Sequence, residues 1–310
     1  MMKLGNSPYL LLVLATCIWG SNFVAGKALV DSIPPVTLAA ARWGVAFLCL
    51  LPFFGRQAWR QRREYISRWK TVLFLSATGV AGFNTLTYMA VQYTGSINAA
   101  LMNSATPILV VMLASLMMKE KLAWAAMPGI LVSMAGVLWI VGRGSLEALL
   151  GLSFNKGDLL MLLAVLCWAM YSVGMKKAAG LFPPSALLLV QTAVAVALLM
   201  PLSLAELLLE ESGKIAEAPS LAVVSGIIYL GLFASIVAFL SWNRAIELAG
   251  PQRCAGFLNL IPLFSAIFAT IFTGESIRIY HVLGALLIIT GVYMTNRTKK
   301  NGQPQEGSRG

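Results

Sequence analysis

Charged side chains are scarce in this sequence. Only 11% of its 310 residues are Asp, Glu, Lys or Arg, whereas 58% are hydrophobic. A soluble domain carries about twice that charged fraction, so the composition excludes an ordinary soluble fold and predicts that the chain lies in a bilayer. The net charge of +11 comes from short basic clusters between apolar runs. This pattern orients membrane proteins and does not indicate a nucleic-acid partner.

Histidine and cysteine are also rare. The one histidine, His281, excludes a histidine metal cluster, and the four cysteines lie in apolar runs without the paired spacing of a disulfide framework or zinc site. The sequence also lacks a Gly-x-x-x-x-Gly-Lys-Ser/Thr motif, a His-Glu-x-x-His motif and a nucleophile–base set. We therefore predict no metal, no cofactor, no ATP as driving force and no enzymatic activity.

Long apolar runs fill most of the chain. A membrane-spanning helix needs about 20 mainly apolar residues, and the unsatisfied backbone groups of any other conformation are too costly in lipid. The segments that meet this length are 9–28, 36–54, 71–91, 96–118, 124–142, 158–177, 185–208, 220–243, 253–273 and 279–296. We predict an all-α integral membrane protein with ten transmembrane helices and a disordered cytoplasmic tail over 298–310.

The basic residues predict the orientation of these helices. If the ten spans alternate from a cytoplasmic N-terminus, seventeen Lys and Arg residues lie on the cytoplasmic side and five on the other. Cytoplasmic loops of membrane proteins carry such an excess. The sequence thus predicts a multi-pass protein of the inner (plasma) membrane with both termini in the cytoplasm.

The two halves of the chain match each other at two offsets. At an offset of 149 residues, Trp19 falls on Trp168, and the Pro-Pro pair at 34–35 falls on the pair at 183–184. At an offset of 155 residues the coinciding positions are Pro107 and Pro262, Glu120 and Glu275, Gly129 and Gly284, and Gly136 and Gly291. We predict two five-helix repeats, residues 1–148 and 157–297. Because five is odd, the repeats are inverted, as in many alternating-access transporters.

Several short segments recur in order along both halves. The first half carries Trp19-Gly-Ser-Asn-Phe, Asn98-Ala-Ala-Leu with Pro107, Lys119-Glu120-Lys121 and Gly129 with Gly136-Val137. The second half repeats the later part of this pattern with Pro262, Gly274-Glu275 and Gly284 with Gly291-Val292. This ordered set, spread over nearly the whole chain, resembles the EamA family of the drug/metabolite transporter superfamily. The resemblance implies a secondary exporter of amino acids or related metabolites, driven by a proton or ion gradient. It also implies a central cavity lined by helices 1, 3, 4, 6, 8 and 9 of the ten.

Polar and aromatic side chains inside the predicted spans are the candidates for a substrate site, because such groups are costly in lipid unless they face a cavity or a partner. The candidates are Trp19, Asn22, Arg42, Asn84, Tyr88, Asn103, Trp168, Tyr171, Trp242 and Asn259. A neutral cavity rich in amides and rings suits a zwitterion or an aromatic amine. The same residues also supply interhelical hydrogen bonds and packing, and this alternative stays open.

Arg42 is the one charged residue well inside a predicted span. It lies near enough to a helix end for its guanidinium to extend toward the membrane surface. Alternatively, it faces the cavity and holds a carboxylate through paired hydrogen bonds. Its counterpart at the 149-residue offset is Gln191, which is also polar and favours an inward position for both.

Two prolines and two glutamates are candidate hinge and gate residues. Pro107 and Pro262 interrupt their helices, since a proline inside a helix removes a hydrogen bond and kinks it. Glu120 and Glu275 occupy equivalent ends of the same two helices. A packing kink and an end anchor are the structural alternatives.

The sequence therefore predicts an alternating-access exporter whose partners are a small molecule, the bilayer and a coupling proton or ion. A multidrug or amine exporter of the same fold is the alternative, although the first span lacks the carboxylate that small multidrug transporters use. A membrane-embedded enzyme and a passive channel are further alternatives. The sequence leaves open whether the protein is a monomer or a homodimer.

Overall fold

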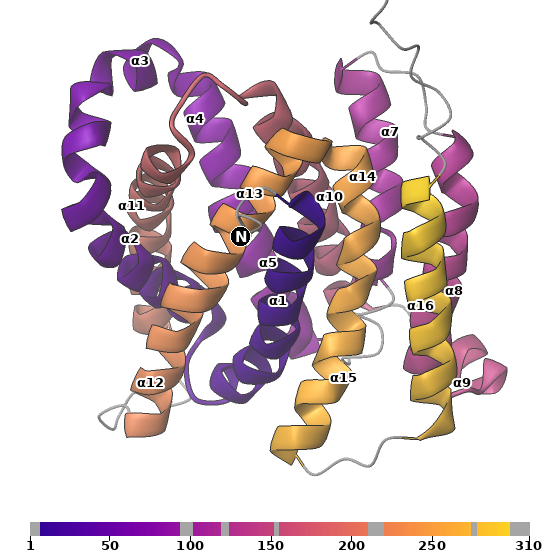
Figure 1. Ribbon diagram of the computed structural model, residues 1–310. Coiled ribbons are helices and arrows are strands. Elements are labelled where there is room, and N and C mark those ends of the chain that lie inside the picture. Colours follow the sequence, from indigo (N-terminus) through magenta and orange to yellow (C-terminus); the bar gives the residue numbers. More distant parts are fainter. Residues whose placement is uncertain are drawn as a thin grey trace, which may run out of the picture.

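The computed structural model describes residues 7–93, 102–118, 124–151, 155–209, 220–273 and 278–297. Within these ranges every regular element is a helix and no strand occurs. The long helices run side by side through one bundle (Figure 1). The predicted all-α class is confirmed.

The helices of the first half coincide with its predicted spans. They are α1 (Pro8–Val30), α2 (Pro35–Arg60), the continuous run of α4 (Trp69–Leu75), η2 (Ser76–Gly82) and α5 (Phe83–Tyr93), then α7 (Thr106–Met118), η3 (Trp124–Ala126) and α8 (Met127–Val141). Two short helices, α3 (Arg62–Ser67) and α9 (Leu146–Leu150), lie outside the predicted spans.

The second half has the same pattern. Its helices are α10 (Lys156–Lys177), α11 (Pro184–Leu209), the run of α12 (Leu221–Tyr229), η4 (Leu230–Val237) and α13 (Ala238–Ala249), then the run of α14 (Pro251–Ala255), η5 (Gly256–Asn259) and α15 (Leu260–Thr273), and finally α16 (Ile279–Arg297). Both η2 and η4 are π-helices.

Six helical runs among the described residues are long and apolar enough to cross a membrane. They are Pro8–Val30, Pro35–Arg60, Trp69–Tyr93, Lys156–Lys177, Pro184–Leu209 and Leu221–Ala249. The apolar helices Met102–Met118, Met127–Val141 and Ile279–Thr295 are shorter. The chain is thus a multi-pass membrane protein, and the count of ten spans stays a prediction.

Local chemistry accounts for several helix ends. Proline occupies the first turn of α1 and α2, where its missing N–H leaves no hydrogen bond unmade. Asn155 and Asp158 form a reciprocal capping box at the start of α10. Gly250 ends α13 with φ at +82°, a conformation that side chains with a Cβ rarely adopt.

Two helix pairs stand at opposite sides of the bundle, with α1 between them (Figure 1). In one pair, α2 packs along α11. Glu206 of α11 caps the start of α2: its carboxylate accepts hydrogen bonds from the backbone N–H of Val36 (3.1 Å) and of Thr37 (2.7 Å), and from the Thr37 hydroxyl (2.9 Å). A carboxylate at a helix N-terminus satisfies free N–H groups and opposes the positive end of the helix dipole.

The other pair, α8 and α16, packs backbone against backbone through four glycines. A Cβ on Gly291 would lie 2.4 Å from the carbonyl oxygen of Gly129, and a Cβ on Gly136 would lie 2.7 Å from that of Gly284. Within lipid the hydrophobic effect does not drive helices together. Close packing of small residues therefore supplies much of the attraction between them. These positions are therefore fixed by packing.

We expect Gly291→Ala to destabilise the protein, because its Cβ forces α8 and α16 apart at a cost of about 1–3 kcal/mol. Gly44→Ala in α2 is the matched control: its Cβ would meet no atom within 4 Å, so its stability should stay the same or rise slightly. Thermal unfolding of the purified proteins in one detergent measures both. Equal midpoints for the two variants would contradict the close packing of α8 on α16.

Candidate functional site

A charged side chain lies buried near the middle of the bundle. Arg42 of α2 is 0% exposed, and its guanidinium donates four hydrogen bonds. Nε donates to the Ser235 hydroxyl (2.9 Å) in η4. Nη1 donates to the Tyr88 hydroxyl (2.7 Å) and the Asn84 amide oxygen (3.1 Å) in α5, and to the Asn22 amide oxygen (3.3 Å) in α1. We name these five residues the Arg42 network.

The network holds a cation among neutral groups. The ion pairs in the described part of the chain, Glu64 with Arg68 and Glu247 with Arg244, do not involve Arg42. Its Nη2 group makes none of the four hydrogen bonds. A buried charge without a counter-ion is costly, and neutral acceptors offset only part of that cost. Among the described residues, therefore, no acidic side chain compensates the charge of Arg42.

The π-helices position the network. Asn84 is the second residue after η2, and its amide nitrogen donates to the carbonyl oxygen of Val80 within η2 (3.2 Å). Ser235 lies within η4 and donates to the carbonyl oxygen of Leu230 (3.0 Å). A π-helix frees backbone carbonyls that an α-helix would occupy, and such segments are frequent at functional sites. Sequence analysis missed Ser235 and both π-helices; apart from the glycines at 79, 82 and 231, no sequence signal marks them.

Beside the network lies an aromatic cluster, which we define as Trp19, Trp168, Tyr171, Phe239 and Trp242. All five side chains are buried. Trp19 and Trp168 meet edge to face with ring centroids 5.0 Å apart, and Trp242 lies 5.5 Å from Trp19 and 5.8 Å from Trp168. Such contacts are favourable beyond the burial of area. In this structure the rings fill the centre of the bundle by packing on one another.

Two indoles of the cluster leave their N–H donors unused. Nε1 of Trp168 and of Trp242 is buried and has no hydrogen-bond partner among the described residues, whereas Nε1 of Trp19 donates to the carbonyl oxygen of Ala234 in η4 (3.1 Å). Buried donors without partners are rare and costly. They are the second feature that distinguishes this region from ordinary close packing.

Trp43 joins the network to the cluster. Its ring lies 5.2 Å from the Arg42 guanidinium carbon and packs edge to face on Phe239, with centroids 5.0 Å apart. Its Nε1 also has no partner among the described residues. Trp43 was not among the sequence candidates, because its position in a long apolar helix gives no sign of which ring it contacts. The two groups form one continuous site.

Tyr171 has a structural role within the cluster. Its hydroxyl donates to the Asn243 amide oxygen in α13 (2.9 Å), and a Cβ on Gly79 would lie 2.1 Å from its ring. The backbone of η2 thus packs directly on this ring. These contacts agree with the packing alternative for Tyr171, and its predicted role in binding stays a prediction.

The remaining sequence candidates lie apart from the Arg42 network. Asn259 in η5 donates to the Ser133 hydroxyl of α8 (2.7 Å), which is a link between helices. Asn103 is buried just before α7, and the hydroxyl of Thr106 bonds its backbone oxygen (2.5 Å). No interaction of Asn103 or Asn259 with the network or the cluster occurs among the described residues.

The two prolines lie at helix discontinuities, closer to helix starts than expected. Pro107 is the second residue of α7, after a break at Ala105, and Pro262 is the third residue of α15, after the 3₁₀ segment η5. Their predicted hinge role stays a prediction. Glu120 and Glu275 lie outside the described residues.

A multi-pass helical bundle with a polar, aromatic site at its centre defines the class of a membrane transporter. The chain belongs to the EamA-like transporter family, whose family model matches residues 6–142 and 155–297. The resemblance inferred from the sequence is therefore confirmed. The protein is a transporter rather than an enzyme, with a small-molecule substrate and the lipid bilayer as its surroundings.

Its similarity to curated proteins extends over the full length of each. An uncharacterized transporter of Bacillus subtilis, YyaM, is 29% identical over 289 residues, which cover 92% of each chain. A probable terminal-alkyne amino-acid exporter of Streptantibioticus cattleyicolor is 24% identical, covering 99% of this chain and 98% of that protein. A probable amino-acid metabolite efflux pump of Salmonella typhimurium is also 24% identical, covering 92% and 93%.

A solved crystal structure of 18% sequence identity shares the fold. It superposes with a TM-score of 0.73 over 93% of this chain and 96% of that one.

We expect Tyr171→Phe to lower stability by about 1–3 kcal/mol, because it leaves the buried Asn243 oxygen without a donor. Replacing both partners, as Tyr171→Phe with Asn243→Leu, should recover part of the loss. Tyr9→Phe, at an exposed tyrosine of α1, is the control and should have no effect. Thermal unfolding in detergent gives the three values. Additive losses in the double variant would contradict a specific Tyr171–Asn243 bond.

Proposed function

We propose that the protein is a secondary transporter that exports amino acids or related small metabolites from the cytoplasm by alternating access. The observation that carries the proposal is the buried Arg42 guanidinium, whose partners among the described residues are all neutral. In this proposal the protein lies in the plasma membrane with both termini in the cytoplasm, and a proton or ion gradient drives it.

The site suits a substrate with a carboxylate at one end and an apolar or aromatic group at the other. A carboxylate at Arg42 supplies the missing negative charge and can accept from the unused Nη2 group. The substrate's apolar part then enters the aromatic cluster by displacing ring–ring contacts. The free indole N–H groups of Trp168 and Trp242 supply donors for further substrate oxygens.

The names of two relatives agree with this substrate class, since one is described as an amino-acid exporter and the other as an amino-acid metabolite efflux pump. Because each is only 24% identical to this chain, these relatives support the substrate class but do not indicate a particular amino acid.

Alternating access in this proposal rests on two inverted five-helix repeats. Three observations support them. The π-helices η2 and η4 start 154 residues apart and end 155 residues apart, close to the sequence offset. The matching tryptophans Trp19 and Trp168 contact each other at the centre. The matching glycines of α8 and α16 contact each other at the periphery. All three arrangements follow naturally from a pseudo-twofold axis through the bundle.

A multidrug or amine exporter is the second candidate. The faces of the tryptophan rings attract ammonium groups, which favours it. The charge of Arg42 opposes it, because a cation without a carboxylate would be repelled by the guanidinium. The two candidates therefore differ in whether the substrate must carry a carboxylate.

Two measurements distinguish the amino-acid exporter from the amine exporter: thermal stabilisation of the purified protein by ligand, and counterflow in proteoliposomes. The probes are the common amino acids and, for each active one, its amide and its decarboxylated amine. We expect the amino acid to raise the melting temperature of the protein and to exchange across the proteoliposome membrane, whereas its amide and its amine do neither. Arg42→Gln should weaken binding by about 10- to 100-fold, the size of a lost hydrogen bond to a charged group. Without ligand, its melting temperature should fall modestly, because the acceptors of the network lose their common donor, while removal of the buried charge offsets part of that loss.

Arg42→Lys and Arg244→Gln complete the test. Arg42→Lys keeps the charge but loses the planar fork of donors. Its affinity for the amino acid should therefore fall between that of the native protein and that of Arg42→Gln. Arg244 is paired with Glu247 and partly exposed, so its loss should leave binding unchanged. Equal binding of an amino acid and its amine by the native protein would favour the amine exporter. Unaltered affinity in Arg42→Gln would remove Arg42 from the site.

A further inference from the structure

A pocket of about 330 Å³ lies between α4, α7 and α10, away from the Arg42 network. Its walls are apolar and include Phe74 and Leu75 of α4, Met117 of α7, and Leu181 just before α11. Two lysines complete the lining, Lys70 at the start of α4 and Lys177 at the end of α10. The pocket thus combines an apolar interior with two positive charges.

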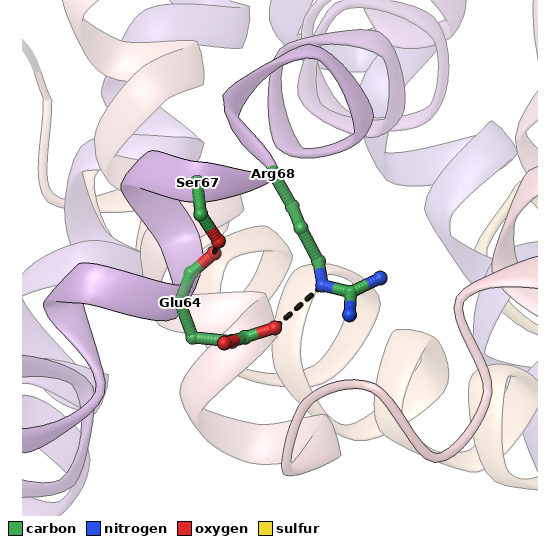
Figure 2. Close-up of polar contacts among 3 residues, drawn as sticks. All are labelled: Glu64, Ser67 and Arg68. Atoms are coloured by element: carbon green, nitrogen blue, oxygen red, sulfur yellow. Dashed lines mark hydrogen bonds and ion pairs between the residues drawn. The ribbon is translucent and has the colours of Figure 1, made fainter.

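Neither lysine has an acidic partner among the described residues, although the neighbouring cations are engaged. Figure 2 shows Arg68 paired with Glu64 through Nε (2.5 Å). Lys176 donates to the backbone oxygen of Glu247 (3.0 Å). Lys70 lies over the Trp69 ring, 5.9 Å from its centroid, a contact that leaves its charge uncompensated. The two cations that line the pocket can therefore pair with an anion from outside the described chain.

The position of Lys177 on α10 indicates that the pocket opens toward lipid. Lys177 follows Leu159 by 18 residues and Leu163 by 14, which is about five and four helical turns, so all three lie on one face. The two leucines are 62% and 44% exposed, as expected of side chains that contact acyl chains. Trp69, beside Lys70, is 55% exposed, and exposed tryptophans mark the level of the lipid headgroups.

The pair of charges occurs at one membrane face only. At the offset of 149 residues, Lys177 corresponds to Ala28. At the offset of 154 residues that relates η2 to η4, Lys70 corresponds to Val224, so the matching positions in the other half carry neither cation. The lysines lie at the face that carries the clusters of Arg and Lys between the predicted spans. Anionic lipids attract such basic residues, and basic pockets between transmembrane helices bind their headgroups.

We propose that this pocket binds one anionic phospholipid from the leaflet at that face. The headgroup phosphate lies between the ammonium groups of Lys70 and Lys177. One acyl chain lies against Phe74, Leu75 and Met117. The lipid thereby bridges the ends of α4, α7 and α10, three helices that otherwise meet here through apolar contacts.

Native mass spectrometry of the delipidated full-length protein in detergent tests the proposal. The probes are phosphatidylglycerol and phosphatidylcholine with identical acyl chains, each titrated alone. We expect one site that prefers phosphatidylglycerol by about tenfold or more. Lys70→Gln with Lys177→Gln should weaken phosphatidylglycerol binding by about ten- to thirtyfold and leave phosphatidylcholine binding unchanged. Lys70→Arg with Lys177→Arg should retain the preference, which shows that the charge is required.

Arg60→Gln with Arg63→Gln is the matched control. It removes two charges from the same face, at exposed residues that do not line the pocket, and should change binding less than threefold. A loss as large as that of the lysine variant would show general charge attraction and overturn the site. Equal binding of the two lipids would also overturn it. So would complete displacement of phosphatidylglycerol by free inorganic phosphate, since the pocket would then be an anion site without a role for the acyl chain.

Discussion

The buried guanidinium of Arg42 is the constraint on which the centre of this protein depends. A positive charge in the low-dielectric interior needs several polar partners at once, and α2 alone cannot supply them. The partners come from α1, α5 and η4, so these elements must converge on α2. Within the described residues every partner is neutral, so none of them compensates the charge. That imbalance is the basis of the proposal that the network binds an anionic group.

Different interactions stabilise the periphery and the centre of the bundle. At the edge, α8 and α16 approach so closely that glycine backbones touch, which favours one fixed arrangement. At the centre, large rings pack on one another and leave indole donors without acceptors. Ring–ring contacts are individually weak and can be exchanged for contacts with a ligand of similar shape. A transporter needs both: helices that keep their packing, and a centre whose contacts can be replaced.

The sequence predicted most of the helices and much of the site. Apolar run length located the six helical runs that are long and apolar enough to cross a membrane, because the bilayer sets that length. Trp19, Trp168, Tyr171 and Trp242 were expected together, and their rings form one cluster. Ser235 and Trp43 were missed, because their roles arise from contacts between helices distant in the chain. Asn259 was expected beside the other candidate residues, but its side chain donates to the Ser133 hydroxyl. Helical periodicity predicts the face of a helix on which a residue lies, but it does not predict which neighbouring helix that face contacts.

The capping of α2 by Glu206 has a mechanical consequence. α2 carries Arg42, yet its first turn is held by a carboxylate from α11, in the other half of the chain. A substrate carboxylate bound to Arg42, as proposed, would therefore pull on a helix whose first turn is anchored to the second half of the chain. The backbone hydrogen bonds of α2 would carry that strain to the anchor. Both halves of the chain would then respond to the same bound substrate, although only the first contributes the charge.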